Sequence, residues 1–66
     1  MTLTINGATQ DADDGTTLAA LLDGLGVARD GIAVALNDGV VPRMRHAQTV
    51  LRDGDRLEII VAVAGG

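Results

Sequence analysis

The chain has 66 residues, enough for one small domain but not for a second domain or a deep enclosed active site. Its 47% content of hydrophobic residues excludes an intrinsically disordered chain, although Phe, Tyr, Trp and Cys are all absent. The net charge of −4 has the wrong sign for binding a phosphate backbone. We therefore expect a small folded protein that binds no nucleic acid. With His46 as its single histidine, it should also hold no metal.

The first predicted element is a β-hairpin. Thr2 to Ile5 alternates polar and apolar residues, Asn6-Gly7 favours a tight turn, and Ala8 to Ala12 returns as a weak edge strand. A helix follows, capped by Thr16 or Thr17. Its apolar stripe consists of Leu18, Leu21, Leu22 and Leu25. Gly24 and Gly26 mark the end of the helix.

The second half of the chain is predicted to be mostly extended. Ile32 to Leu36 is a continuous apolar run, typical of a buried strand, and residues 37–39 form a turn before Val40-Val41. Pro42 ends that strand, and Arg43 to Gln48 forms a short helical turn in which His46 is expected at the surface or half-buried.

Asp53-Gly54-Asp55 predicts a tight turn rather than a calcium loop, because the further oxygen ligands of such a loop are missing. The longest strand follows. One face of this strand is predicted to carry Leu57, Ile59, Val61 and Val63. The opposite face carries Glu58, Ile60, Ala62 and Ala64, and it is unusually apolar for an exposed face.

This order of elements predicts an α+β fold, in which a single helix covers one face of a mixed sheet of four to five strands. We expect residues 1–63 to form the domain and residues 64–66, Ala64-Gly65-Gly66, a flexible tail. Because the helix leaves the second face open, the face bearing Ile60 and Ala62 is predicted to dock on partner proteins. The surface arginines are expected to be solvated.

No arrangement of residues predicts catalysis, so we expect no enzyme activity. The two terminal glycines instead predict a tail that threads into another protein's active site, because glycine has no Cβ to clash in a narrow channel. The Gly66 carboxylate would be the reacting group. Since a carboxylate is a poor electrophile, an enzyme would first have to join it to AMP.

Three segments of the chain carry a resemblance to a known family: Gly31 to Arg43, Leu51 to Ile59, and Val63 to Gly66. Together they are similar to the sulfur carriers of thiamin biosynthesis, the ThiS family, whose fold is the ubiquitin-like β-grasp. The resemblance spans the whole chain. One departure is His46, which stands where the family often has an aromatic residue.

The resemblance implies that an E1-like adenylyltransferase uses ATP and magnesium to activate Gly66, with Gly65 and Ala64 threading its active site. A sulfur-donating enzyme then makes a terminal thiocarboxylate, which gives its sulfur to thiazole synthase. No cofactor is expected on the chain itself.

Three alternatives remain open at this point. The chain could carry sulfur for molybdopterin or cysteine synthesis, it could be a ubiquitin-like protein modifier, or it could be a plain β-grasp interaction module. No membrane span or signal peptide is present in the sequence, so the expected location is the cytoplasm.

Overall fold

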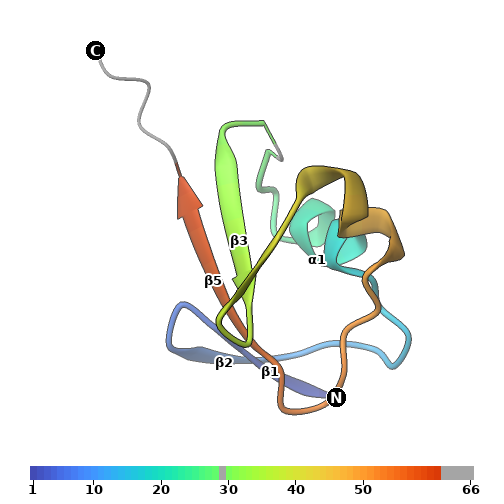
Figure 1. Cartoon of the computed structure of the whole chain (residues 1–66). Helices are drawn as coiled ribbons and strands as arrows, with labels where there is room; N and C mark the ends of the chain where they lie inside the picture. Colours follow the sequence, from blue (N-terminus) through green and yellow to red (C-terminus); the bar gives the residue numbers. More distant parts are fainter. Residues whose placement is uncertain (29, 62–66) are drawn as a thin grey trace.

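In the part of the chain that the structure describes, five strands form one sheet, and a single α-helix packs against one of its faces (Figure 1). The computed structural model describes residues 1–28 and 30–61. The elements in chain order are β1 (Thr2–Ile5), β2 (Ala8–Asp11), α1 (Leu18–Gly24), β3 (Ile32–Leu36), β4 (Gly39–Val41), the 3-10 helix η1 (Arg43–Gln48) and β5 (Arg56–Val61). No helix within these residues is long and apolar enough to cross a membrane.

The sheet is mixed, with the strand order β2-β1-β5-β3-β4. The last strand, β5, lies in the centre: it runs parallel to β1 and antiparallel to β3. The two hairpins, β1–β2 and β3–β4, form the two sides of the sheet. The α+β prediction, with its mixed sheet and single covering helix, is therefore confirmed.

Both predicted hairpin turns are present, and each begins with an asparagine in the left-handed region. Asn6 has φ +49° and is followed by Gly7 at +83°, while Asn37 has φ +49° and is followed by Asp38 at +71°. Asparagine tolerates this backbone conformation better than most residues with a Cβ. The turn predictions are thus confirmed, and Pro42 follows the end of β4 as expected.

Helix α1 begins at the second of its two candidate caps. The Thr17 side chain accepts a hydrogen bond from the Ala20 N–H at 3.2 Å, which satisfies one of the free donors of the first turn. The chain leaves the helix through Gly26, whose φ of +72° favours glycine. The leucine stripe faces inward, as the helical spacing predicts.

The core lies between α1 and the covered face of the sheet. Its buried members are Leu3, Leu18, Leu21, Leu22, Val34, Leu51 and Leu57. Strand β3 is less buried than its continuous apolar run predicts, because only Val34 is buried and Ala33 is exposed. The reason is that the helix covers one face only, so alternate residues of β3 remain on the open side.

The prediction that His46 lies at the surface or half-buried is wrong. Its side chain is 1% exposed, and its Nε2 lies 3.1 Å from the Val41 carbonyl oxygen. Helix η1 packs against α1 and turns the imidazole inward, in a chain that has no Phe, Tyr or Trp to occupy such a position. The ring is therefore part of the buried interior, and its Nδ1 has no hydrogen-bond partner in the described residues.

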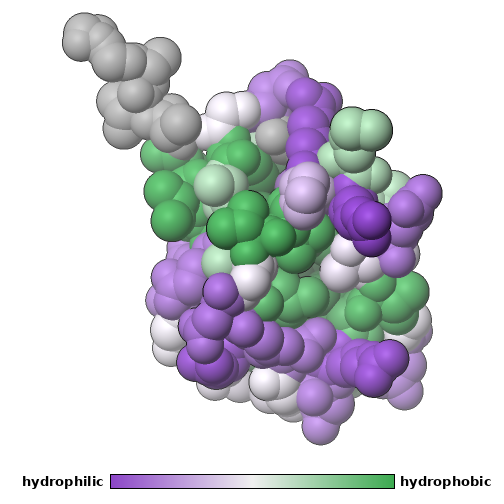
Figure 2. Space-filling view, viewed as in Figure 1, coloured by the Kyte–Doolittle hydropathy of each residue, from purple (hydrophilic) through white to green (hydrophobic). Residues whose placement is uncertain are grey.

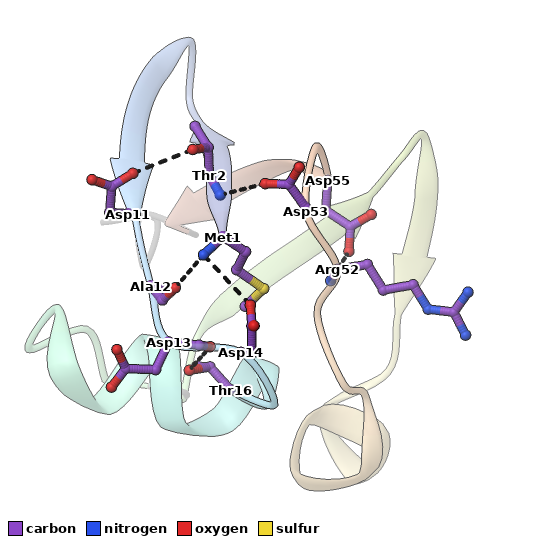
Figure 3. Close-up of polar contacts among 10 residues, drawn as sticks. All are labelled: Met1, Thr2, Asp11, Ala12, Asp13, Asp14, Thr16, Arg52, Asp53 and Asp55. Atoms are coloured by element: carbon purple, nitrogen blue, oxygen red, sulfur yellow. Dashed lines mark hydrogen bonds and ion pairs between the residues drawn. The ribbon is translucent and has the colours of Figure 1, made fainter.

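The turn before β5 ties that strand to the start of the chain (Figure 3). Asp53 accepts a hydrogen bond from the Thr2 N–H at 2.6 Å, and Asp55 accepts one from the Arg52 N–H at 2.8 Å. Gly54 takes φ +86° and donates its N–H to the Thr2 carbonyl at 2.8 Å. Both aspartates thus accept hydrogen bonds from backbone N–H groups, and the tight-turn prediction is confirmed.

Candidate functional site

The residues predicted to carry the chemistry follow β5 in the sequence. Gly66, Gly65 and Ala64, and Ala62 of the predicted docking face, lie outside the described residues. The structure describes the strand that leads to them as far as Val61. The candidate site therefore consists of the last residues of β5 and the sheet surface around them.

The two ends of β5 have different surroundings. At its start, Leu57 lies opposite Ile5 of β1 on one side and Leu36 of β3 on the other, and it is 1% exposed. At its end, Val61 lies opposite Ile32 of β3 and has no strand partner on the β1 side. The upper ends of β5 and β3 accordingly extend beyond the β1–β2 hairpin (Figure 1).

Val61 shows that the covered face stops short of the end of β5. Strand alternation places Leu57, Ile59 and Val61 on the same face. Leu57 is buried and Ile59 packs against the core, but Val61 is 65% exposed. Among the described residues of the predicted shared face, only the first two are thus covered.

The opposite face of the sheet carries an apolar patch near the same end. Ile60 is 61% exposed and lies beside Ala33, while Val40 is 76% exposed and lies beside Ala35. We call these four residues, Ala33, Ala35, Val40 and Ile60, the outer patch. Hydrophobic atoms reach the surface close to the upper end of β5 (Figure 2). Ile60 therefore has the exposure that a docking role requires.

Two ion pairs lie near the sheet. Arg43 contacts Asp30, and Arg56 Nη2 lies 3.2 Å from Asp38 Oδ2. All four side chains are more than half exposed, so each ion pair contributes little to stability. Both arginines are solvated, as predicted, but each also has an acidic partner.

Nothing in residues 1–28 and 30–61 resembles catalytic machinery. These residues contain no pocket and no group of three His, Cys, Asp or Glu side chains that could hold a metal ion. They contain a strand whose described part ends at Val61 and an apolar patch on the same sheet. Such an arrangement can present a terminus to another protein.

Sequence reasoning missed the two asparagine side chains that hold β5. Asn6 was interpreted only as a turn residue, yet its amide bonds to both the N–H and the carbonyl of Ile59. Asn37 in the other hairpin accepts a hydrogen bond from the Arg56 N–H at 2.9 Å. The signal that could have revealed them is that asparagine begins both hairpin turns.

Comparison with known proteins adds evidence independent of this geometry. The model of the ThiS family matches residues 3–66, which include the two last glycines. The sulfur carrier protein ThiS of Escherichia coli is 33% identical over 66 residues, and the alignment covers 100% of each chain. The crystal structure of the thiamine biosynthesis protein ThiS from Geobacter metallireducens superposes with a TM-score of 0.85 at 33% identity, with 100% of each chain covered.

Two longer relatives carry a different name. Proteins called thiazole synthase from Magnetococcus marinus and Paramagnetospirillum magneticum are 39% and 41% identical over 66 residues. The alignments cover 100% of this chain but only 20% of each relative, so the chain spans about a fifth of their length. Because the family model matches nearly the whole chain, and a full-length relative and a solved structure agree with it, this protein belongs to the ThiS family.

Proposed function

We propose that this protein is a sulfur carrier in thiamin biosynthesis, in which the carboxylate of Gly66 is the group that carries sulfur. The observation that carries the proposal is the family match over residues 3–66, which extends through both terminal glycines. The protein acts as a co-substrate of other enzymes and not as a catalyst. Its own contribution is to present the tail (Ala64-Gly65-Gly66) from the end of β5.

The first step activates the tail. A Gly66 carboxylate oxygen attacks the α-phosphorus of ATP in an E1-like adenylyltransferase, with magnesium on the phosphates, and pyrophosphate leaves. The resulting acyl-adenylate is an electrophile with a good leaving group. Gly65 and Gly66 suit this step because a backbone without Cβ atoms fits a narrow channel.

The second step introduces sulfur. A persulfide on a sulfur-donating enzyme attacks the Gly66 carbonyl carbon through its terminal sulfur and displaces AMP, which gives an acyl disulfide. A thiol then attacks the donor's sulfur in that acyl disulfide, so that a new disulfide forms on the donor and the Gly66 thiocarboxylate leaves. The thiocarboxylate then gives its sulfur to thiazole synthase. The absence of Cys and Lys from the sequence supports this route, because no side-chain thiol or amine of the chain competes for the activated carbonyl.

Thiazole synthase is the acceptor that the comparisons favour. The whole of this chain is similar to a segment of two proteins with that name. That relationship supports, for the separate chain, a partner of the same kind.

Docking requires a surface as well as a tail. We assign it to the outer patch with Ala62, so that the activating enzyme and the synthase would recognise the same open face of the sheet. The support is that Ile60 is exposed on the strand that leads to Gly66, and that Val40 is exposed on β4, on the other side of β3. Apolar residues at the centre of such a surface typically contribute most of the binding energy.

The intact mass of the protein tests the carrier chemistry. After incubation with ATP, cysteine and lysate of its own host, we expect a mass shift that matches replacement of one oxygen by sulfur, localised to Gly66. The shift should be absent without ATP and in a chain that lacks Gly66. An unchanged mass in active lysate would contradict the proposal, and heavier amide-linked species would indicate a protein modifier instead.

The acceptor pathway is tested in the host. Deletion of the gene should cause thiamin auxotrophy that supplied thiazole relieves. Growth without thiamin, or a requirement for a molybdopterin or cysteine product, would assign the sulfur to another pathway. This outcome is separate from the mass measurement, which reports only the carrier chemistry.

Substitution of Ile60 tests the docking face. We expect Ile60→Asp to lower the kcat/KM of adenylation and of sulfur delivery about tenfold or more, because a charge replaces an apolar contact at the interface. Val50→Asp is the matched control, since Val50 is also exposed, at 55%, but lies outside the sheet strands. Unchanged rates for Ile60→Asp, or equal losses in both variants, would refute the assignment.

A further inference from the structure

Two asparagines hold the central strand β5 from its two neighbours. Asn6 Oδ1 accepts a hydrogen bond from the Ile59 N–H at 2.7 Å, and Asn6 Nδ2 donates to the Ile59 carbonyl at 3.2 Å. Asn37 Oδ1 accepts from the Arg56 N–H at 2.9 Å, and its Nδ2 donates to Asp55 Oδ1 at 2.9 Å. Each asparagine begins a hairpin turn with φ +49°. Asn37 therefore acts at the start of β5 and Asn6 three residues further along it.

The Asn6 side chain continues the pairing of β1 with β5 after the β1 backbone has turned away. The backbone N–H groups of Thr4 and Asn6 donate to the carbonyls of Asp55 and Leu57 at 3.0 and 2.9 Å. The next groups of β5 that face this side belong to Ile59. A side-chain amide has the same donor and acceptor as a peptide group, so the Asn6 side chain supplies both bonds that a longer β1 backbone would have made to Ile59.

Within the described residues, the two Asn6–Ile59 hydrogen bonds are also the last ones on this side of β5. Beyond them, the described part of the strand pairs only with β3, through Ala33 opposite Ile60 and Ile32 opposite Val61. Ile59 is thus the last residue of the described strand with a hydrogen bond on the β1 side, and it lies seven positions before Gly66 in the sequence.

We propose that Asn6 is a positioning residue for the tail: its side chain fixes the direction in which β5 leaves the sheet, so that the outer patch and Gly66 engage one enzyme together. This inference rests on the proposed function. Asn6 touches no reacting atom and acts only through Ile59.

The physical consequence of losing the Asn6 side chain is a change in the population of directions that the end of β5 adopts. Without the Asn6 amide, the end of β5 is held by β3 alone and samples several directions, of which a fraction suits simultaneous docking and threading. The apparent affinity for the enzyme falls by that fraction, whereas a tail that has entered the active site reacts as before. KM should therefore rise while kcat stays the same.

The test compares Asn6→Gly with Asn37→Gly. Glycine accepts the left-handed backbone at both positions, and each variant loses two side-chain hydrogen bonds. We expect Asn6→Gly to speed amide hydrogen exchange at Ile59 about tenfold, the effect of roughly 1.4 kcal/mol from two hydrogen bonds, and Asn37→Gly to do so at Arg56 instead. Unchanged exchange at Ile59 would overturn the proposal.

Kinetics of ATP-dependent adenylation by the host's activating enzyme separate positioning from stability. Asn6→Gly should raise KM about tenfold at unchanged kcat, while Asn37→Gly, with a similar loss of stability, should leave both constants unchanged. A competitor lacking Gly65 and Gly66 reports docking alone, and its inhibition constant should be the same with Asn or Gly at position 6. Equal changes in KM for both variants, or a weaker competitor, would show that Asn6 is only structural or acts on the docking face.

Failure of the proposed function has a different signature. If the unsubstituted protein is not adenylated at all, the carrier proposal is wrong and the positioning role falls with it. If it is adenylated and Asn6→Gly matches it in KM, the carrier proposal stands and only the role of Asn6 is refuted.

Discussion

The first half of β5 contributes to the stability of the fold, whereas the second half is exposed and available for recognition by partners. Leu57 in the first half lies between two strands and under the helix, whereas Ile60 and Val61 in the second half are mostly exposed and pair with β3 alone. One six-residue strand thus belongs to the core at its start and to the surface at its end. Residues that fix the fold and residues available to partners are consequently different residues.

This division matters because the protein is small. A single core in a chain of this size supplies only about 3–5 kcal/mol, and the chain has no cysteine to add a disulfide. Burying the end of β5 would add stability but would remove the surface beside the tail. Substitutions in the two halves should therefore differ in what they damage.

The largest effect is expected for Leu57→Ala. Removing a fully buried leucine costs about 3 kcal/mol through lost burial and the cavity left behind, a large share of the total stability. Val61→Ala is the matched control and should cost less than about 0.5 kcal/mol, because Val61 is already exposed. Urea unfolding measures both. Similar losses in the two variants would mean that the halves of β5 do not differ.

His46→Ala should have the next largest effect, a loss of about 2 kcal/mol. The substitution opens a cavity between η1 and the core and removes the bond to the Val41 carbonyl. The loss should be smaller than for Leu57 because the imidazole also buries an unsatisfied nitrogen. Unfolding of His46→Ala beside Met44→Ala, which alters a 90% exposed neighbour, checks this, and equal stability of the two would contradict a core role for the ring.

The smallest of the three effects is expected for Thr17→Ala, about 1 kcal/mol. The variant loses the cap on the Ala20 N–H, at an end of α1 that has no acidic residue in its first turn. Thermal unfolding of Thr17→Ala and Thr16→Ala distinguishes the two candidate caps. A larger loss for Thr16→Ala would show that the bond of Thr16 to the Asp13 carbonyl matters more than the helix cap.

Local sequence patterns predicted most elements, because the information they need lies within a few residues. The turns at Asn6 and Asn37, the cap at Thr17 and the alternation along β5 all depend on backbone preference or on a fixed period. The same patterns placed the element bounds closely and drew attention to the terminal glycines. Those glycines remain the centre of the functional proposal.

Burial was less predictable, because it depends on which element covers a residue. Ala33 belongs to an apolar run and Val61 to an apolar alternation, yet both are exposed because α1 does not reach them. His46 was expected near the surface and is buried, because η1 packs against α1 and turns the ring inward. Periodicity specifies a face, but only packing decides whether that face is covered.

The sequence by itself determined the α+β class, the two hairpins, the single helix and the Gly-Gly terminus as the group to consider. Tertiary structure alone decided that β5 lies between β1 and β3, that its end is open, and that Asn6 bonds to Ile59 across 53 positions of the chain. The physical reason is the range of the interactions. Turns and caps are local, whereas strand order and side-chain bonds between distant residues exist only once the chain has folded.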